Sequence, residues 1–184
     1  MTREEGLKLV NEKIQNQNLV KHCLAVEVCM RDLAEKFGED IEKWGLAGLL
    51  HDIDYEETKN EPDKHSLIGA EMLEKAGLDK EICEAVKTHN ERHGIAPESK
   101  MAKALFSVDP LTGLIVAATL VLPSKKIADL TAENVINRFG EKSFAHGANR
   151  EIISKCQELL GLSLEEFVKI CLGAMKTIPD DLGL

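Results

Sequence analysis

The sequence has no excess of basic residues. Lys and Arg number 23 against 32 Asp and Glu, which gives a formal net charge of −9. Such a chain lacks the positive field that drives non-specific binding to nucleic acid or to anionic membranes. We therefore expect neither a membrane nor nucleic acid as a broad partner. A phosphate group would need a local positive centre, either a metal ion or a few placed cationic side chains.

Signals for export and membrane insertion are also missing. The N-terminal segment is charged throughout and has no apolar region of the kind found in a secretory signal. The longest apolar stretch, Leu114–Leu122, is far shorter than the roughly 20 residues that span a bilayer. The cysteines are odd in number and form no C-x-x-C pair, so we expect buried free thiols in a reducing cytoplasm. They are Cys23, Cys29, Cys83, Cys156 and Cys171.

Several catalytic motifs are absent, namely G-x-S-x-G, G-x-x-x-x-G-K-[ST] and G-x-G-x-x-G. What the sequence does contain is apolar residues at steps of three and four, as from Leu19 to Phe37, and no clean two-residue alternation. This pattern predicts an all-α fold, a compact helical bundle in one structural domain. We expect residues 1–122 to form a helical core and residues 123–184 a C-terminal helical extension packed on it.

Capping signals mark the expected helices. Capping boxes open helices at Thr2–Glu5 and Ser163–Glu166. Between them we expect helices over 18–37, from 40 to His51–Asp52, over about 63–76, and from 79 through His89. A further helix from 99 is expected to end at Pro110, with a separate buried helix over 111–122. Asn149 is expected to begin a helix that runs to Gly161.

Histidine and aspartate residues recur where these apolar helices end or face inward. His22 borders the apolar stripe of its helix, His51–Asp52 closes the next, and Asp109 ends a third. A carboxylate in an apolar setting is costly unless it is paired or bound to a metal. The simplest common cause is a metal ion held between helices. The alternative is that these are core histidines bonded to backbone carbonyls and aspartates that cap helices.

The ordered set His22, His51–Asp52 and Asp109 resembles the H…HD…D pattern of the HD-domain superfamily of metal-dependent phosphohydrolases. The resemblance covers roughly residues 18–122. His65 and His89 fall between the doublet and Asp109, as in HD subgroups that hold two metals. The resemblance then implies that His22, His51, Asp52 and Asp109 bind one ion. It implies that Asp52, His65 and His89 bind a second, with Asp52 bridging the two.

Imidazole and carboxylate ligands together suit a divalent transition metal, namely Fe, Mn, Zn, Co or Ni, as one or two ions. We expect Asp52 to act both as a metal ligand and as a catalytic residue. Asp54 and Tyr55 follow the doublet closely enough to line the mouth of the pocket. Asp54 is either a general acid or a support for a ligand, and the alternative is a polar turn at a helix end.

The two remaining histidines are His93 and His146. His93, four residues after His89, is an alternative ligand, a residue that supports a ligand, or a polar residue where its helix emerges. His146 is interpreted as a loop residue with no role. His65 has an alternative too, as a surface histidine in the first turn of its helix. Lys125, Lys126 and Arg150 are the candidates for binding a substrate phosphate, and the alternative is a solvated surface cluster.

The sequence therefore predicts a cytoplasmic phosphohydrolase in which a metal-bound hydroxide attacks a nucleotide or another small phosphorylated metabolite. Self-association into a homo-oligomer is left open. Two alternatives remain at this point: a di-iron oxygenase of the same superfamily, and a non-catalytic sensor that binds a metal or a nucleotide.

Overall fold

The computed structural model describes all 184 residues and contains helices and no strands, which confirms the predicted all-α class. The α-helices are α1 (Arg3–Lys13), α2 (Gln17–Phe37), α3 (Ile41–Leu50), α4 (Tyr55–Thr58), α5 (Leu67–Lys75), α6 (Lys80–Thr88), α7 (Lys100–Leu120), α8 (Ala132–Gly140), α9 (Arg150–Ser154), α10 (Cys156–Leu160), α11 (Leu164–Met175) and α12 (Pro179–Leu182). Two short 3₁₀ helices are η1 (Glu91–His93) and η2 (Ile127–Asp129).

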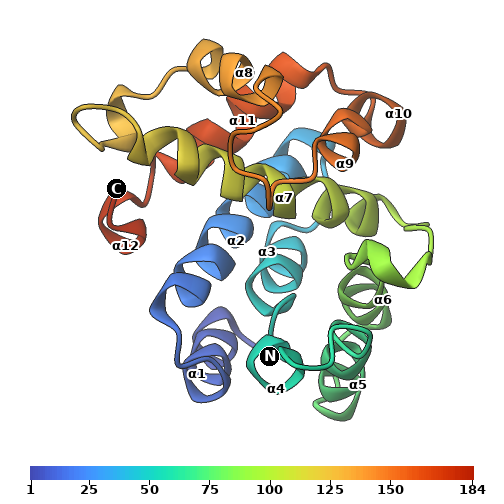
Figure 1. Ribbon diagram of the computed structural model, residues 1–184. Helices are drawn as coiled ribbons and strands as arrows, with labels where there is room; N and C mark the ends of the chain where they lie inside the picture. Colours follow the sequence, from blue (N-terminus) through green and yellow to red (C-terminus); the bar gives the residue numbers. More distant parts are fainter.

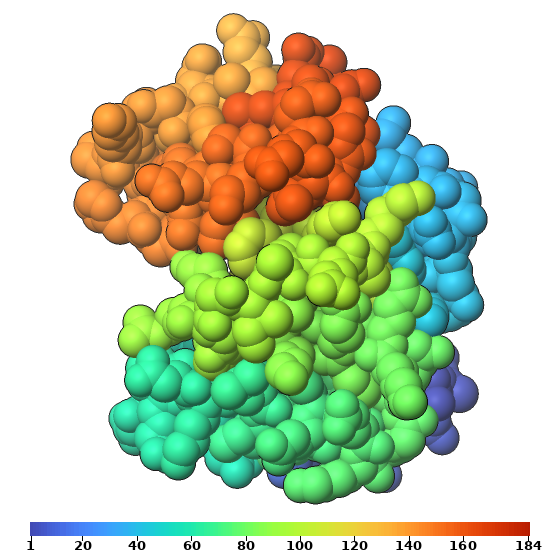
Figure 2. All heavy atoms as spheres, turned by 90° about the vertical axis from the view of Figure 1, so that its right-hand side faces the viewer, coloured from blue at the N-terminus to red at the C-terminus, as the bar shows by residue number.

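The two longest helices, α2 and α7, organise the molecule. Helix α7 runs across the middle, with α1, α3, α5 and α6 below it and α8 to α11 above it (Figure 1). Helix α2 packs on α3, α7 and α11 and so joins the two parts. Figure 2 shows the same division from the side, with the teal and green segments below, the orange and red segments above, and a light-blue segment at the right beside both. One continuous hydrophobic core runs through both parts.

Helices α2 and α3 approach each other closely because of Gly48. A Cβ atom at this position would lie 2.9 Å from the Cα of Glu27 and 2.9 Å from the carbonyl oxygen of Val26, both backbone atoms of α2. Real Cβ atoms are not found at such distances, so only glycine fits there. The contact places the end of α3, where the His51–Asp52 doublet lies, directly beside α2.

Helix α7 corrects the prediction of two helices that meet at Pro110. It is continuous from Lys100 to Leu120 with Pro110 inside it. Proline in a helix interior removes one backbone hydrogen bond and costs about 3 kcal/mol. Buried side chains on both sides, such as Leu105 and Leu114, offset that cost. The helix is long and apolar enough to cross a membrane, but 67% of its apolar window is buried inside the protein, as in the core helix of a globular domain.

Three other predicted boundaries also differ. Asn16, not Asn18, is the N-cap of α2. Helix α5 begins at Leu67 rather than near residue 63, because Ser66 has a φ of 71° and interrupts the helix there. His65 therefore lies in the preceding turn. The helix expected up to Gly161 is divided into α9 and α10 at Lys155.

Candidate metal centre

The six predicted ligands lie in one region of the structure, although they come from five separate segments of the chain. The residues are His22 in α2, His51 and Asp52 at the end of α3, His65 before α5, His89 at the end of α6, and Asp109 in α7. Helix ends supply three of these residues because α3 and α6 both terminate beneath α7. The close α2–α3 contact described above brings His22 against His51.

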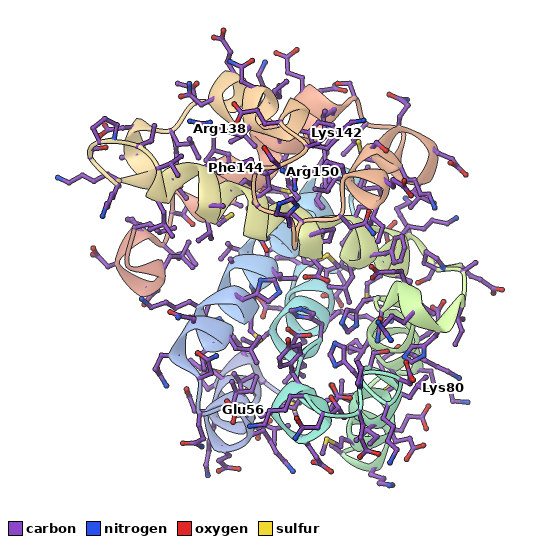
Figure 3. The ribbon with its side chains drawn as sticks, viewed as in Figure 1. Glu56, Lys80, Arg138, Lys142, Phe144 and Arg150 are labelled. Carbon is purple, nitrogen blue, oxygen red and sulfur yellow. The ribbon has the colours of Figure 1, made fainter.

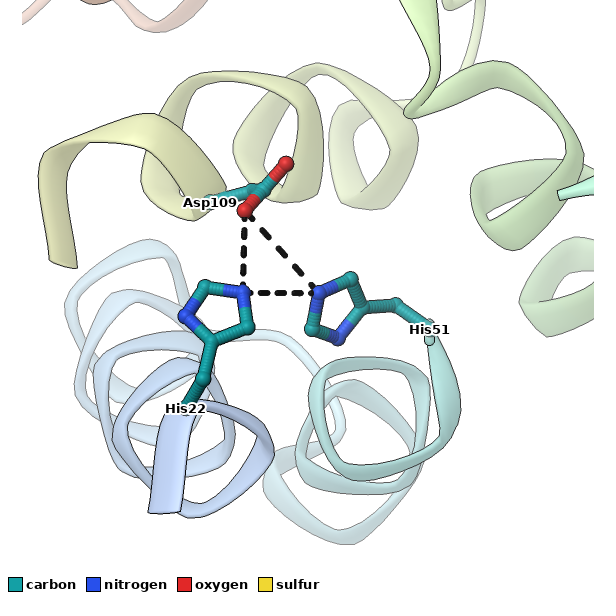
Figure 4. Close-up of side chains that lie close together, drawn as sticks. All are labelled: His22, His51 and Asp109. Carbon is teal, nitrogen blue, oxygen red and sulfur yellow. Dashed lines mark hydrogen bonds and ion pairs between the residues drawn. The ribbon is translucent and has the colours of Figure 1, made fainter. Parts of the chain in front are cut away.

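The first grouping consists of His22, His51 and Asp109 (Figure 4). The Nε2 atoms of the two histidines are 3.2 Å apart. Asp109 Oδ1 lies 3.0 Å from Nε2 of His22 and 3.9 Å from Nε2 of His51. Ligands at about 2.1 Å from one ion are themselves separated by roughly 3–3.5 Å. Two of the three separations fall in that range and the third, 3.9 Å, lies slightly beyond it, so the three atoms are close to the spacing of donors around a single metal ion.

Asp52 is the residue that joins this grouping to the remaining histidines. Its Oδ1 lies 3.5 Å from Nε2 of His51, 3.3 Å from that of His65 and 3.5 Å from that of His89. Its Oδ2 lies 3.8 Å from Nε2 of His22. The two carboxylate oxygens thus face different histidines, which is the arrangement a bridging carboxylate requires. His51, Asp52 and His89 also form a second group of potential ligands.

Each of the four imidazole rings has its Nδ1 atom engaged outside the centre. Nδ1 of His51 donates to the carbonyl of Gly48 at 2.8 Å, and that of His89 to the carbonyl of Val86 at 2.7 Å. These acceptors fix the tautomer in which Nε2 carries a lone pair. Both carbonyls come from the last turn of the helix that each histidine ends, so the helix terminus itself orients the ring.

Side chains perform the same task for the other two rings. Nδ1 of His65 donates to Asp54 Oδ1 at 2.9 Å. Nδ1 of His22 lies 3.2 Å from Thr112 Oγ1, and that hydroxyl donates its own proton to the carbonyl of Asp109 at 2.9 Å. The hydroxyl oxygen can therefore accept from His22. All four Nε2 atoms are left to face the carboxylates, as metal-ligating histidines do.

The protonation states of the buried groups also suit metal binding. Burial lowers the pKa of His51 to about 4, so its ring is neutral at neutral pH. Burial alone would raise the pKa of Asp52, but the surrounding histidines hold it well below its usual value. The pKa of Asp109 is likewise lowered, because His22 outweighs the effect of burial. These three groups thus offer anionic carboxylates and a neutral ring, which are the forms that bind a divalent cation.

Burial would lower the pKa of two further rings, but hydrogen bonds to Asp52 and Asp54 raise the pKa of His65 to about 10, and Asp109 raises that of His22. These two rings therefore release a proton when they bind a cation.

The four rings form a row, and the row ends at Tyr55. Neighbouring ring centroids are 5.0 Å apart for His22 and His51, 5.0 Å for His51 and His89, 5.1 Å for His89 and His65, and 5.3 Å for His65 and Tyr55. The middle of the row is buried, with His51 at 0% and His89 at 2% side-chain exposure. The ends are more open, at 23% for His22 and 14% for His65. The two ends of the row therefore form the solvent-accessible rim of the centre.

Asp54 lies behind the centre rather than at its mouth. It is fully buried, and its Oδ2 accepts from the backbone N–H of Ser66 at 2.8 Å and of Gly69 at 2.9 Å. With Oδ1 bound to His65, both oxygens are occupied. This geometry favours the role of supporting a ligand over that of a general acid. Tyr55, by contrast, is 46% exposed and lies at the mouth as expected.

The remaining candidates lie elsewhere. His93 follows α6 instead of extending it, and its Nε2 donates to the carbonyl of His65 at 2.7 Å, so it supports the turn that carries a ligand. His146 is exposed in the loop before α9. Lys125 and Lys126 are exposed after the end of α7, and the 11 helical steps between Asp109 and Leu120 amount to about 17 Å.

Arg150 is occupied within its own loop. Its guanidinium donates to the carbonyls of Ala145 at 2.6 Å and Ala148 at 2.7 Å, and also to that of Phe144. Figure 3 shows Arg150 beside Phe144 above α7. These bonds close the loop between α8 and α9 and occupy three of the guanidinium donors, and Nε is buried without a partner.

Two residues of the centre were not singled out from the sequence. Thr112 orients His22, and the only sequence signal is its place three residues after Asp109 on the same helix. Asn90 donates through Nδ2 to the carbonyls of His65 at 3.2 Å and Pro62 at 3.4 Å. It directly follows His89, but no sequence pattern shows that it would hold the distant His65 turn.

The chain belongs to the HD domain family, whose model matches residues 19–136. The match contains all six candidate ligands, and the clustered His and Asp side chains fit an HD-type metal site. The predicted resemblance is confirmed. The family and the site together place the chain among the metal-dependent phosphohydrolases.

Curated relatives include the Ribonuclease Y of Lawsonia intracellularis, which is 33% identical over 139 residues, or 74% of this chain and 26% of the relative. That of Nitratidesulfovibrio vulgaris is 33% identical over 142 residues, covering 74% and 27%. That of Alkaliphilus metalliredigens is 33% identical over 142 residues, covering 74% and 29%. The chain thus spans about a quarter of the length of these relatives.

These relatives correct the prediction about partners. They are named for an action on RNA, which contradicts a small phosphorylated substrate and the exclusion of nucleic acid. The error came from the net charge, which averages over the whole surface. A nucleic acid that is held at a metal centre and a few neighbouring side chains needs no basic surface elsewhere.

Proposed function

We propose that this chain hydrolyses phosphodiester bonds of RNA at a centre of one or two divalent metal ions. The observation that carries the proposal is the convergence of four Nε2 atoms on two carboxylates while every Nδ1 is engaged elsewhere. The choice of RNA is supported by the name of the relatives that match 74% of the chain.

The proposed assignment of ligands is the one that the HD-domain pattern implies, and His51 lies between the two groups, near Asp52 Oδ1 at 3.5 Å and His22 Nε2 at 3.2 Å. His22, His51, Asp52 and Asp109 would hold one ion, and Asp52, His65 and His89 the other, with one oxygen of Asp52 directed to each side. The mixture of imidazole and carboxylate favours Mn, Fe, Zn, Co or Ni over Ca. When bound, such ions supply a Lewis acid and lower the pKa of a water molecule near the phosphate.

The protein's own residues perform the remaining tasks. The buried ring of His51 and the buried carboxylate of Asp52 exclude bulk water from the inner side of the centre. The more open side chains of His22 and Asp109, at 23% and 31% exposure, form the rim where a phosphodiester would enter. Hydrolysis forms a bond from water oxygen to phosphorus and breaks the bond to a sugar oxygen, which leaves with a proton.

The proposal also includes the organisation and the compartment of the chain. The five cysteines are buried and free, which suits a reducing compartment such as the cytoplasm. Residues 1–122 would act as the metal-binding core, since they supply every proposed ligand. Residues 123–184 would serve as a supporting extension packed on α2 and α7.

The test is cleavage of a single-stranded oligoribonucleotide by purified protein that has been stripped of metal and reloaded with Mn, Fe, Zn, Co or Ni. We expect cleavage with at least one metal and none with chelator. His51→Ala should lower the rate at least 100-fold, because it removes a buried ligand. His146→Ala is the matched control and should retain the wild-type rate, since His146 is exposed outside the centre.

Identical purification of the His51→Ala variant excludes a contaminating ribonuclease as the source of activity. Failure of every metal-loaded sample to cleave RNA, with metal bound to the protein, would contradict the proposed function. Equal cleavage by wild type and His51→Ala would contradict the assignment of the centre.

A further inference from the structure

A small pocket opens beside the His65 end of the row of rings, outside the set of candidate ligands. It has a volume of about 190 Å³, and its lining includes Tyr55, Lys59, His65 and Arg92. The side chains of Tyr55, Lys59 and Arg92 are exposed, and no part of the metal centre uses them. An exposed aromatic ring with two cations next to a hydrolytic centre is the composition of a nucleotide-binding surface.

The local structure holds these side chains in place. Tyr55 begins α4 and Lys59, its C-cap residue, follows four residues later with helical dihedral angles, so the two side chains lie on one face. Glu56 fixes this short helix, because its Oε1 accepts from the backbone N–H of Gln15 at 2.7 Å and of Asn16 at 2.6 Å. Figure 3 shows Glu56 where α4 meets the end of α1. The rings of Tyr55 and His65 are nearly perpendicular, at 82°, and Tyr55 remains 46% exposed.

The cations are available to a phosphate. Lys59 makes no ion pair, and Arg92 is paired only with Asp63, whose side chain is 85% exposed. Exposed pairs of this kind contribute little, so a phosphate can replace the carboxylate of Asp63. Asn90 holds the backbone around Arg92, because its Oδ1 accepts from the N–H of that residue at 3.2 Å.

The size of the pocket decides the class of ligand. Pockets that bind a free small molecule usually have roughly 300–1,000 Å³, so 190 Å³ is too small for such a ligand. It is suitable for one planar base of a longer strand that is anchored at the neighbouring centre. We propose that Tyr55, Lys59 and Arg92 bind the nucleotide next to the scissile phosphate of a single-stranded RNA, with the base on Tyr55 and its phosphate on the two cations. This inference rests on the proposed function, since it names where that substrate lies.

The test measures binding separately from cleavage. A fluorescein-labelled oligoribonucleotide with slowly hydrolysed phosphorothioate linkages is titrated with metal-loaded protein, and the anisotropy is recorded at several salt concentrations. Base stacking on an aromatic ring implies that Tyr55→Ala raises Kd about 5- to 150-fold, whereas Tyr55→Phe stays within twofold of wild type. Lys59→Ala should reduce the slope of log Kd against log salt by about 0.7.

Lys80→Ala is the control for charge. Lys80 is exposed at the start of α6, on the outer edge of the molecule in Figure 3, and should leave both Kd and the slope unchanged. Thermal unfolding of each variant should match wild type, because the substituted side chains are exposed.

The outcomes separate this inference from the proposed function. Weaker binding by Tyr55→Ala and Lys59→Ala, with Lys80→Ala unchanged, supports the nucleotide site whether or not the wild type cleaves RNA. Equal binding by all variants overturns it, even if the wild type cleaves RNA. Absence of any binding by the wild type also overturns it.

Discussion

Substitution of Asp54 separates two effects, because its two carboxylate oxygens accept hydrogen bonds from different groups. Oδ2 accepts from two backbone N–H groups and Oδ1 accepts from Nδ1 of His65. In Asp54→Asn one oxygen becomes an NH₂ group, which can only donate. The side chain keeps both backbone bonds if its oxygen stays where Oδ2 was. The NH₂ group then faces His65, whose Nδ1 must accept instead of donate.

The consequence is a change of tautomer at a proposed ligand. A proton on Nε2 of His65 would point at Asp52, only 3.3 Å away, and would block the lone pair that binds metal. Loss of such a supporting carboxylate lowers metal affinity about 10- to 100-fold, or about 1.4–2.7 kcal/mol. The free energy of unfolding should fall by only about 1 kcal/mol, because the side chains of residue 54 and His65 still form a hydrogen bond, now between two neutral groups.

Asp54→Ala gives the contrasting result. It leaves the N–H groups of Ser66 and Gly69 buried without an acceptor, at about 1–3 kcal/mol each. The free energy of unfolding should therefore fall by about 2–6 kcal/mol, well beyond the effect of Asp54→Asn. Asp63→Asn, at an 85% exposed carboxylate nearby, should change neither stability nor metal affinity.

The assays are calorimetric titration with metal, denaturant unfolding, and the ¹⁵N chemical shifts of the His65 ring. We expect one of the two metal-binding events to weaken in Asp54→Asn and the shifts to report a proton on Nε2. Wild-type affinity for both ions, with the His65 tautomer unchanged, would refute the reasoning that Asp54 orients a ligand.

Three further predictions use pairs of variants or a change of conditions. Thr112→Val removes the acceptor for His22 and should lower metal affinity about tenfold by calorimetry, whereas Thr119→Val, buried on the same helix but bonded only to a backbone carbonyl, should not. In denaturant titrations, Gly48→Ala should lower the free energy of unfolding by about 1–3 kcal/mol, because its Cβ would clash with the backbone of α2. Gly113→Ala has open space around it and should be neutral or raise the free energy of unfolding by up to about 1 kcal/mol. Chelation of the metal should lower Tm by about 5–11 °C, since binding at 100 times Kd contributes about 2.7 kcal/mol, and an unchanged Tm on chelation would show that no ion is held.

The sequence predicts the helical class well, and the six candidate ligands that it singles out lie in one region of the structure, for identifiable reasons. Apolar residues at steps of three and four determine which face of a helix is buried, and the His51–Asp52 doublet lies where such a face ends. The exact ends of the helices depend on contacts that the local sequence does not reveal. Ser66 interrupts α5 because Asp54 binds its N–H from another segment. Pro110 fails to end α7 because both flanks are buried.

Long-range roles were harder to predict for the same reason. The hydrogen bond from Thr112 to His22 and the support of His65 by Asn90 join residues that are far apart in sequence. The sequence makes Arg150 a candidate for binding a phosphate, but its guanidinium closes its own loop through carbonyl groups that the local pattern does not reveal. The class of substrate was mistaken because net charge is a property of the whole surface, whereas binding at a metal centre is local.

Anomalous diffraction from crystals loaded with Mn or Zn tests the central claim most directly, because it locates each ion against the side chains. The account predicts a peak within about 2.0–2.3 Å of Nε2 of His22 and His51, and a second within the same distance of Nε2 of His65 and His89, with an oxygen of Asp52 bound to each. Peaks confined to other acidic residues, or none between these helices, would contradict it.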